Sequence, residues 1–79
     1  MLAKNKSVSV RARVARNLKT SPETLAILAK DKNEWVRIEV ARNPNTPKDI
    51  LATLAKDENV SVNSWAKKLW TSFDDKEIV

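Results

Sequence analysis

The chain has 79 residues, enough for one domain with a modest core, and it contains no cysteine, histidine or glycine. These absences exclude disulfides, thiol and imidazole chemistry, the usual zinc and iron–sulfur sites, and glycine-rich phosphate loops. The longest apolar run, Leu25–Ala29, falls far below the roughly 20 residues that span a bilayer. We therefore expect a cytoplasmic protein with no membrane segment, metal or cofactor.

The net charge of +5 is concentrated at the N-terminal end of the chain. Residues 1–22 carry six basic side chains and no acidic one, whereas residues 23–79 carry nine basic and ten acidic side chains. The six are Lys4, Lys6, Arg11, Arg13, Arg16 and Lys19. A basic, acid-poor start is also typical of a transit peptide, but the internal repeat makes these residues part of the fold.

A repeat of 26 residues dominates the sequence. Aligned without a gap, residues 10–35 and 36–61 are identical at 14 of 26 positions. The register continues at both ends, because Leu2 to Lys4 match Leu28 to Lys30 and Val62 matches Val36. We therefore expect about two and a half stacked units, with the partial units capping the stack.

Each unit is predicted to form two helices. Apolar residues at three- and four-residue spacing predict one set of helices at about 7–17, 33–43 and 60–73. Threonine three residues before an acidic residue is a capping-box spacing, and a proline between them suits a first helical turn. These signals predict the starts of the other helices, at about 21–30 and 47–56. The residues that carry them are Thr20, Pro22 and Glu23 in one unit, and Thr46, Pro47 and Asp49 in the next.

The predicted fold is all-α, because no long alternating β-branched run occurs and hairpin glycines are absent. The apolar stripes of the two sets of helices should face each other and form the core. Its predicted members are Val10, Val14, Leu18, Leu25, Leu28, Val36, Val40, Leu51 and Leu54.

The last predicted helix is more aromatic than its predecessors. Large rings cover the open end of a stack well, so we expect an aromatic C-terminal cap, with self-association or a membrane-surface helix as alternatives. One helical-repeat domain should then span residues 1–73, followed by a disordered acidic tail at 74–79. The apolar face of this helix carries Val62, Trp65, Ala66, Leu69, Trp70 and Phe73.

The run from Val36 to Asp57, with the motif ARNPNTP at residues 41–47, resembles the variant leucine-rich repeat, a helical unit related to HEAT repeats. The resemblance covers nearly the whole chain, although the earlier copy of the motif, ARNLKTS, is degenerate. It implies a short right-handed α-solenoid used for binding, with one helix of each pair short or 3₁₀. Some members carry an iron–sulfur cluster on a cysteine-bearing segment, a feature that a chain without cysteine cannot share.

The resemblance to HEAT-like repeats also implies a structural role for several charges. In such repeats an acidic side chain at the end of one helix and an arginine near the start of the next form a ladder of hydrogen bonds between units. We expect the Asp31 carboxylate to bond Arg37 or an arginine in the next unit, since arginine can bond two neighbours at once. The spacing of six residues occurs three times: Asn5 to Arg11, Asp31 to Arg37 and Asp57 to Asn63.

Catalytic residues are not evident. The common nucleophile and base pairs need histidine or cysteine, which leaves only carboxylate pairs such as Glu34/Glu39 and Asp57/Glu58. Both pairs fall on polar helix starts or faces, where a solvated surface is expected. We predict that the chain is not an enzyme.

Residues that break the repeat are the candidates for binding. On a helical wheel Trp35, Ile38 and Arg42 point away from the core stripe. Tryptophan and arginine are enriched at binding hot spots, and an apolar patch ringed by charge marks interfaces. The alternative is that Trp35 packs over a neighbouring helix. The residues equivalent to Trp35, Ile38 and Arg42 are Ser9, Ala12 and Arg16 in one neighbouring unit and Ser61, Ser64 and Lys68 in the other.

Two kinds of partner remain open. The first is a protein, or a second copy of the chain, bound through Trp35, Ile38, Arg42, Arg16 and Lys68. The second is a nucleic acid whose phosphates contact the six basic residues before position 22, together with Arg42 and Lys68. Net charge favours the second, but the later residues carry no charge excess and no groove-reading motif occurs, so protein binding ranks first.

Overall fold

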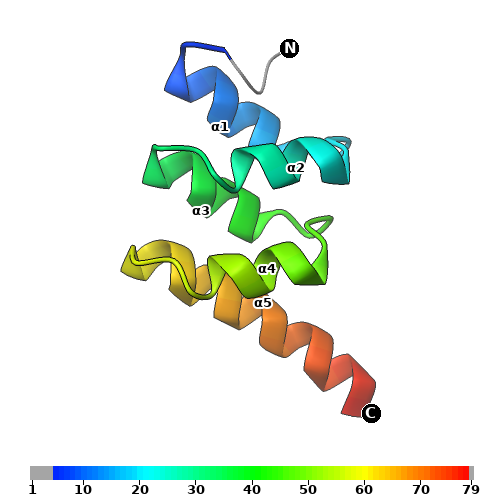
Figure 1. The fold of residues 1–79 in the computed structure, drawn as a ribbon. Helices are drawn as coiled ribbons and strands as arrows, with labels where there is room; N and C mark the ends of the chain where they lie inside the picture. The colour runs from blue at the N-terminus through cyan, green and yellow to red at the C-terminus, as the bar shows by residue number, and fades with distance from the viewer. Residues whose placement is uncertain (1–4, 79) are drawn as a thin grey trace.

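The computed structural model describes residues 5–78, with side chains described for residues 5–70. This part of the chain forms five helices and no strand: α1 Val8–Arg16, α2 Pro22–Leu28, α3 Glu34–Arg42, α4 Lys48–Leu54 and α5 Val60–Ile78. The helices stack in two layers, with α1, α3 and α5 in one layer and α2 and α4 across it (Figure 1). The predicted all-α repeat solenoid is confirmed.

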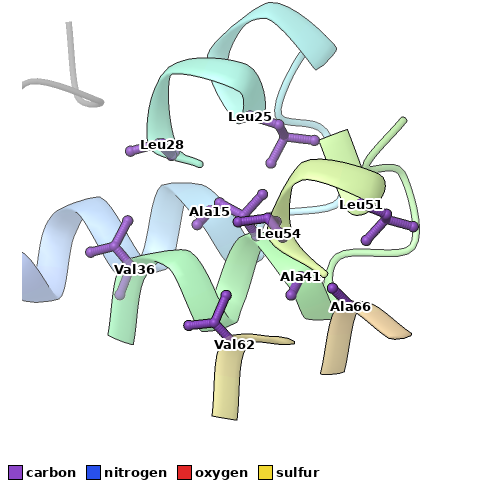
Figure 2. Close-up of a cluster of buried hydrophobic side chains, with 11 residues drawn as sticks. Ala15, Leu25, Leu28, Val36, Ala41, Leu51, Leu54, Val62 and Ala66 are labelled. Atoms are coloured by element: carbon purple, nitrogen blue, oxygen red, sulfur yellow. The ribbon is translucent and has the colours of Figure 1, made fainter. Parts of the chain in front are cut away.

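The core lies between the two layers (Figure 2). Leucines from α2 and α4 meet valines and alanines from the other layer, and burial of each such leucine stabilises the fold by about 1.5–3 kcal/mol. Six of the nine predicted core residues are buried: Leu25, Leu28, Val36, Val40, Leu51 and Leu54. The full buried apolar set is Ala12, Ala15, Leu25, Leu28, Val36, Val40, Ala41, Leu51, Leu54, Val62 and Ala66.

The predictions for the first helix are partly wrong. Val14 is only partly buried against the core, and Leu18 is 62% exposed because α1 ends at Arg16 and its apolar stripe ends with it. Ala12, which the helical wheel places on an outer face, is 2% exposed. A helix in this layer packs beside another helix as well as onto α2, so more than one stripe of α1 is covered.

The threonines before α2 and α4 do not act as helix caps. Thr20 donates its hydroxyl to the Val14 carbonyl at 2.5 Å, and Thr46 donates to the Val40 carbonyl at 2.6 Å. The carbonyls in the last turn of a helix lack partners within that helix, and each threonine supplies one. The capping-box prediction is therefore wrong, and Ser21 caps α2 instead.

α5 is longer than the sequence predicts. Asn17 and Asn43 are the C-cap residues of α1 and α3. The same repeat position in the last unit is Leu69, a good helix former. α5 continues through it to Ile78 and includes most of the segment 74–79, for which a disordered tail is predicted. The division of the chain into a domain and a tail stays a prediction.

The two tryptophans of α5 pack on the core near one end of the stack. Trp65, Leu69 and Trp70 are partly buried there, in agreement with a covering role. Lys48 of α4 also lies over the Trp70 ring, with its Nζ 4.8 Å from the ring centroid. Phe73 lies outside the residues whose side chains are described.

An arginine–aspartate ladder, formed by Arg11, Asp31, Arg37 and Asp57, joins the units. Arg11 donates from Nε and Nη2 to the two carboxylate oxygens of Asp31, at 2.7 and 3.3 Å. Its third nitrogen, Nη1, donates to the backbone carbonyl of Asn5 at 2.7 Å. One guanidinium thus fixes both the loop before its own helix and the loop before the next unit's helix.

Arg37 repeats this geometry one unit later. It bonds the Asp57 carboxylate at 2.8 and 3.3 Å and the backbone carbonyl of Asp31 at 2.7 Å. A ladder of arginine and aspartate is present, but the predicted partner of the Asp31 carboxylate is wrong: Arg11 of the same unit bonds it, and Arg37 bonds the Asp31 backbone carbonyl instead. The spacing of six residues corresponds to the carbonyl contact, and the ion pair spans 20 residues.

Asn43 forms a second link between units. Its side-chain amide donates to the carbonyls of Ala15 and Asn17, at 2.7 and 3.0 Å, and the residue is only 2% exposed. The asparagine of the repeat motif therefore bonds two carbonyls at the end of the preceding unit's helix, where carbonyls lack partners within the helix.

The ladder perturbs the ionisation of Asp31. Partial burial acts to raise the pKa of this carboxyl, but hydrogen bonds from Arg11 and the Asn33 N–H, together with the charges of Arg11 and Arg37, outweigh it and lower the pKa. A carboxyl with a lowered pKa in the folded state stabilises the fold above its ordinary pKa, and this contribution disappears as the pH falls through the lowered value.

We expect Arg37→Ala to destabilise the fold by about 2–3 kcal/mol, because it leaves the part-buried Asp57 carboxylate and two loop carbonyls without their donor. Arg37→Lys keeps the charge but loses the fork, and should cost about half as much. Urea denaturation measures both, with the exposed Lys56→Ala as the control. A loss for Arg37→Ala no larger than that of the control would contradict a structural role for the ladder.

We also expect Asp31→Asn to destabilise the chain at pH 7, by an amount that shrinks as the pH is lowered below about 4, the ordinary range of an aspartate pKa. The free energy of unfolding should be measured at several pH values between 7 and 2. Glu58→Gln, at an exposed position, is the matched control. A difference between Asp31→Asn and the wild type that is constant across this range would show that the ion pair does not stabilise the fold.

Candidate binding face

Four of the five residues predicted to bind a protein are exposed on the layer of α1, α3 and α5. They are Arg16 on α1, Trp35 and Arg42 on α3, and Lys68 on α5. The fifth, Ile38, is partly buried and packs against the core, because α3 is flanked by α1 on one side and α5 on the other. The predicted exposure of Ile38 is therefore wrong.

A continuous surface, called the Trp35 face below, joins these residues to three others. Trp35 is 44% exposed and donates its indole N–H to Oε2 of Glu39 at 3.2 Å. The tryptophan is thus neither fully packed nor free, since one edge is fixed while much of the ring contacts solvent. The members of the face are Arg13, Arg16, Trp35, Glu39, Arg42, Trp65 and Lys68.

Cations stack on the second indole of this face. The Arg42 guanidinium lies 4.9 Å from the centroid of the Trp65 ring, and Lys68 Nζ lies 5.2 Å from it. Arg42 Nη1 also lies 3.7 Å from Oε2 of Glu39. Cation–π contacts of this kind orient a guanidinium without neutralising its charge. Arg42 is therefore held by an indole ring and by the Glu39 carboxylate, while about half of its side chain stays exposed to solvent.

Two small hollows open on the Trp35 face. The first, of about 130 Å³, is lined by Ser9, Ala12, Arg13, Arg16, Trp35 and Glu39. The second, of about 170 Å³, is lined by Arg16, Leu18, Glu39, Arg42, Asn43 and Pro44. Arg16 and Glu39 line both, so the hollows lie next to each other over α1 and α3. Their size suits single side chains of a partner rather than a whole drug-sized ligand.

Glu39 is the residue that sequence analysis misplaces. It was expected on a solvated surface, yet it is 5% exposed, and its Oε1 atom is buried without a hydrogen-bond partner among the described residues. A clue lay in the repeat register, where Arg13, Glu39 and Trp65 occupy equivalent positions and differ completely in chemistry. Arg13 and Trp65 were likewise missed as members of a protein-binding surface.

The basic residues proposed for nucleic acid lie in different surroundings where the structure describes them. Arg11 is committed to the ladder, where it pairs with Asp31. Arg13 and Arg16 belong to the Trp35 face, whereas Lys6 lines a shallow surface beside the ladder and Lys19 lies in the turn after α1. Lys4 lies outside the described residues.

Metal and membrane sites were also sought. Among the described residues, no group of three or more acidic, histidine or cysteine side chains could hold a metal ion. Over the same residues, no helix has both the length and the apolar content needed to cross a bilayer.

Comparison with known proteins agrees with the repeat geometry. Residues 34–59, one full turn of the solenoid from α3 to the start of the next unit, match the family model described as leucine rich repeat variant. No curated protein and no solved structure matches the chain. The matched segment holds Arg37, Asn43 and Asp57, which carry the ladder and the asparagine link. Residues 34–59 are therefore similar to a leucine rich repeat variant unit, in agreement with the resemblance seen in the sequence.

Proposed function

We propose that this chain is a non-catalytic interaction module that binds an acidic segment of another protein on the Trp35 face. The observation that carries the proposal is a half-exposed tryptophan set among arginines on one surface of the stack. Such a surface resembles an interface hot spot, where aromatic and arginine side chains supply most of the binding energy.

Charge favours an acidic partner. The Trp35 face holds four cations, Arg13, Arg16, Arg42 and Lys68, and one carboxylate, Glu39, so its net charge is 4 − 1 = +3. The side chains of Arg13 and Arg16 make no hydrogen bond or ion pair within the described part of the chain. Guanidinium groups that are not already paired bind carboxylates in a planar, two-point geometry.

The same charge disfavours self-association through two copies of this face, because like charges would be placed opposite one another. Nucleic acid is also attracted to a basic surface, but Arg11 is paired in the ladder and Lys6 lies beside the ladder rather than on the Trp35 face. The face offers hollows for side chains rather than a continuous cationic groove along a backbone.

The proposal predicts that a fluorescein-labelled octaglutamate peptide binds the chain, as measured by fluorescence anisotropy, and that octalysine does not. Arg13→Ala with Arg16→Ala should weaken octaglutamate binding about tenfold or more, since two charge-assisted contacts are lost. Trp35→Ala should weaken it about 30-fold, which is the effect of an interface hot spot of about 2 kcal/mol. The stability of each variant is checked by urea denaturation.

The matched control is Lys30→Ala with Lys56→Ala, which removes the same charge from exposed positions beside the ladder. It should weaken binding by less than about threefold, as expected for screened, distant charges. Equal losses for the two double variants would mean that the peptide responds only to net charge. Binding of a 12-nucleotide oligothymidine in place of octaglutamate, weakened by Arg13→Ala with Arg16→Ala, would replace the protein partner with a nucleic acid.

A further inference from the structure

The Glu39 carboxylate is held at one oxygen and unpaired at the other. Oε2 accepts the Trp35 indole N–H at 3.2 Å and lies 3.7 Å from Arg42. Oε1 is buried and has no donor among the described residues. Buried acceptors in native folds are nearly always paired, so an unpaired carboxylate oxygen under a candidate binding surface calls for an explanation.

Packing of the repeat does not require this carboxylate. The equivalent positions in the neighbouring units hold Arg13 and Trp65, so the same site in the stack accommodates a cation or a ring. Arg13 and Arg16 line the same hollow as Glu39 without donating to it. The only unpaired buried side-chain oxygen of the described residues thus belongs to a residue that lines both hollows that the proposed partner would fill.

We infer that Oε1 of Glu39 accepts a hydrogen bond from a main-chain N–H of the bound acidic segment. This inference rests on the proposed function. Ionised aspartate and glutamate side chains accept hydrogen bonds but cannot donate them, so the N–H groups of an acidic segment belong to its backbone. The segment's carboxylates would bind Arg13, Arg16 and Arg42, while its backbone satisfies the one acceptor among them.

This arrangement distinguishes a polypeptide from a simple polyanion. Glu39 repels any anion that approaches the three arginines, and only a ligand that also brings a donor compensates for the repulsion. Access to Oε1 requires a small movement, because the atom has no exposed surface in the unbound chain. Trp35 borders the first hollow and bonds the same carboxylate, so its indole should change environment when the segment binds.

The test is Glu39→Gln, titrated with octaglutamate and with octaglutamate whose backbone nitrogens are methylated. Glutamine keeps an oxygen for the Trp35 N–H and replaces the second oxygen with a donor. Glu23→Gln, which removes the same charge from the exposed first turn of α2, is the control. We expect Glu39→Gln to weaken octaglutamate binding about fivefold or more, and methylation to weaken binding to the wild type by a similar factor but not to Glu39→Gln.

Tighter binding of octaglutamate to Glu39→Gln would contradict the inference. If the face attracts its partner by charge alone, removing the Glu39 charge should tighten octaglutamate binding, as Glu23→Gln should do slightly, and methylation should have equal effects on both proteins. Should Glu39→Gln fail to fold, the methylated peptide still decides the question on the wild type. Absence of octaglutamate binding to the wild type would instead remove the proposed function, so the two failures are distinguishable.

Discussion

Each ladder arginine contacts two units at once through its planar, forked guanidinium group, and the geometry of the stack depends on these contacts. Arg37 holds the loop before its own helix through the backbone carbonyl of Asp31, which belongs to the preceding unit, and it holds the loop before α5 through both oxygens of Asp57 in its own unit. A lysine could make one of these contacts but not all of them, because its ammonium group lacks a planar fork. The chain has no disulfide, and its core is small, so directional contacts of this kind matter for how the units pack.

Regular stacking creates the candidate binding surface. Because each unit repeats the same backbone path, equivalent positions of α1, α3 and α5 fall in rows across one layer (Figure 1). Where the row keeps its chemistry, as at Arg16, Arg42 and Lys68, a basic stripe results. Where it changes, as from Ser9 to Trp35 to Ser61, one unit gains a feature that its neighbours lack. The fold thus supplies the rows, and substitutions on them supply specificity.

The fold is predicted well from the sequence because the same pattern of helices and apolar positions occurs in more than one unit. Helix pairs and most of the core follow from a period of 26 residues and from apolar spacing, whereas the ladder is implied by the resemblance to HEAT-like repeats. The partner of Asp31 could not be assigned in this way, since two arginines, Arg11 and Arg37, both come within reach and only the stacking geometry selects Arg11 for the carboxylate.

The errors have a common physical cause. A helical wheel describes one helix against one core, whereas α3 is covered by helices on several sides. Ala12 and Ile38 were placed outside for this reason, and Glu39 was placed in solvent although tryptophan and arginine side chains enclose it. The candidate face could be located from the sequence, but the burial that makes Glu39 informative depends on three-dimensional contacts.

The claim that partners dock on the Trp35 face is tested most directly by the three tryptophan indole N–H signals in a nitrogen-15 NMR spectrum. Trp35 and Trp65 belong to the face, whereas Trp70 lies beside Lys48 of α4 and serves as an internal reference. On titration with octaglutamate, the signals of Trp35 and Trp65 should shift together and saturate while that of Trp70 stays in place. A saturable shift of Trp70 alone, with Trp35 and Trp65 unchanged, would contradict the account.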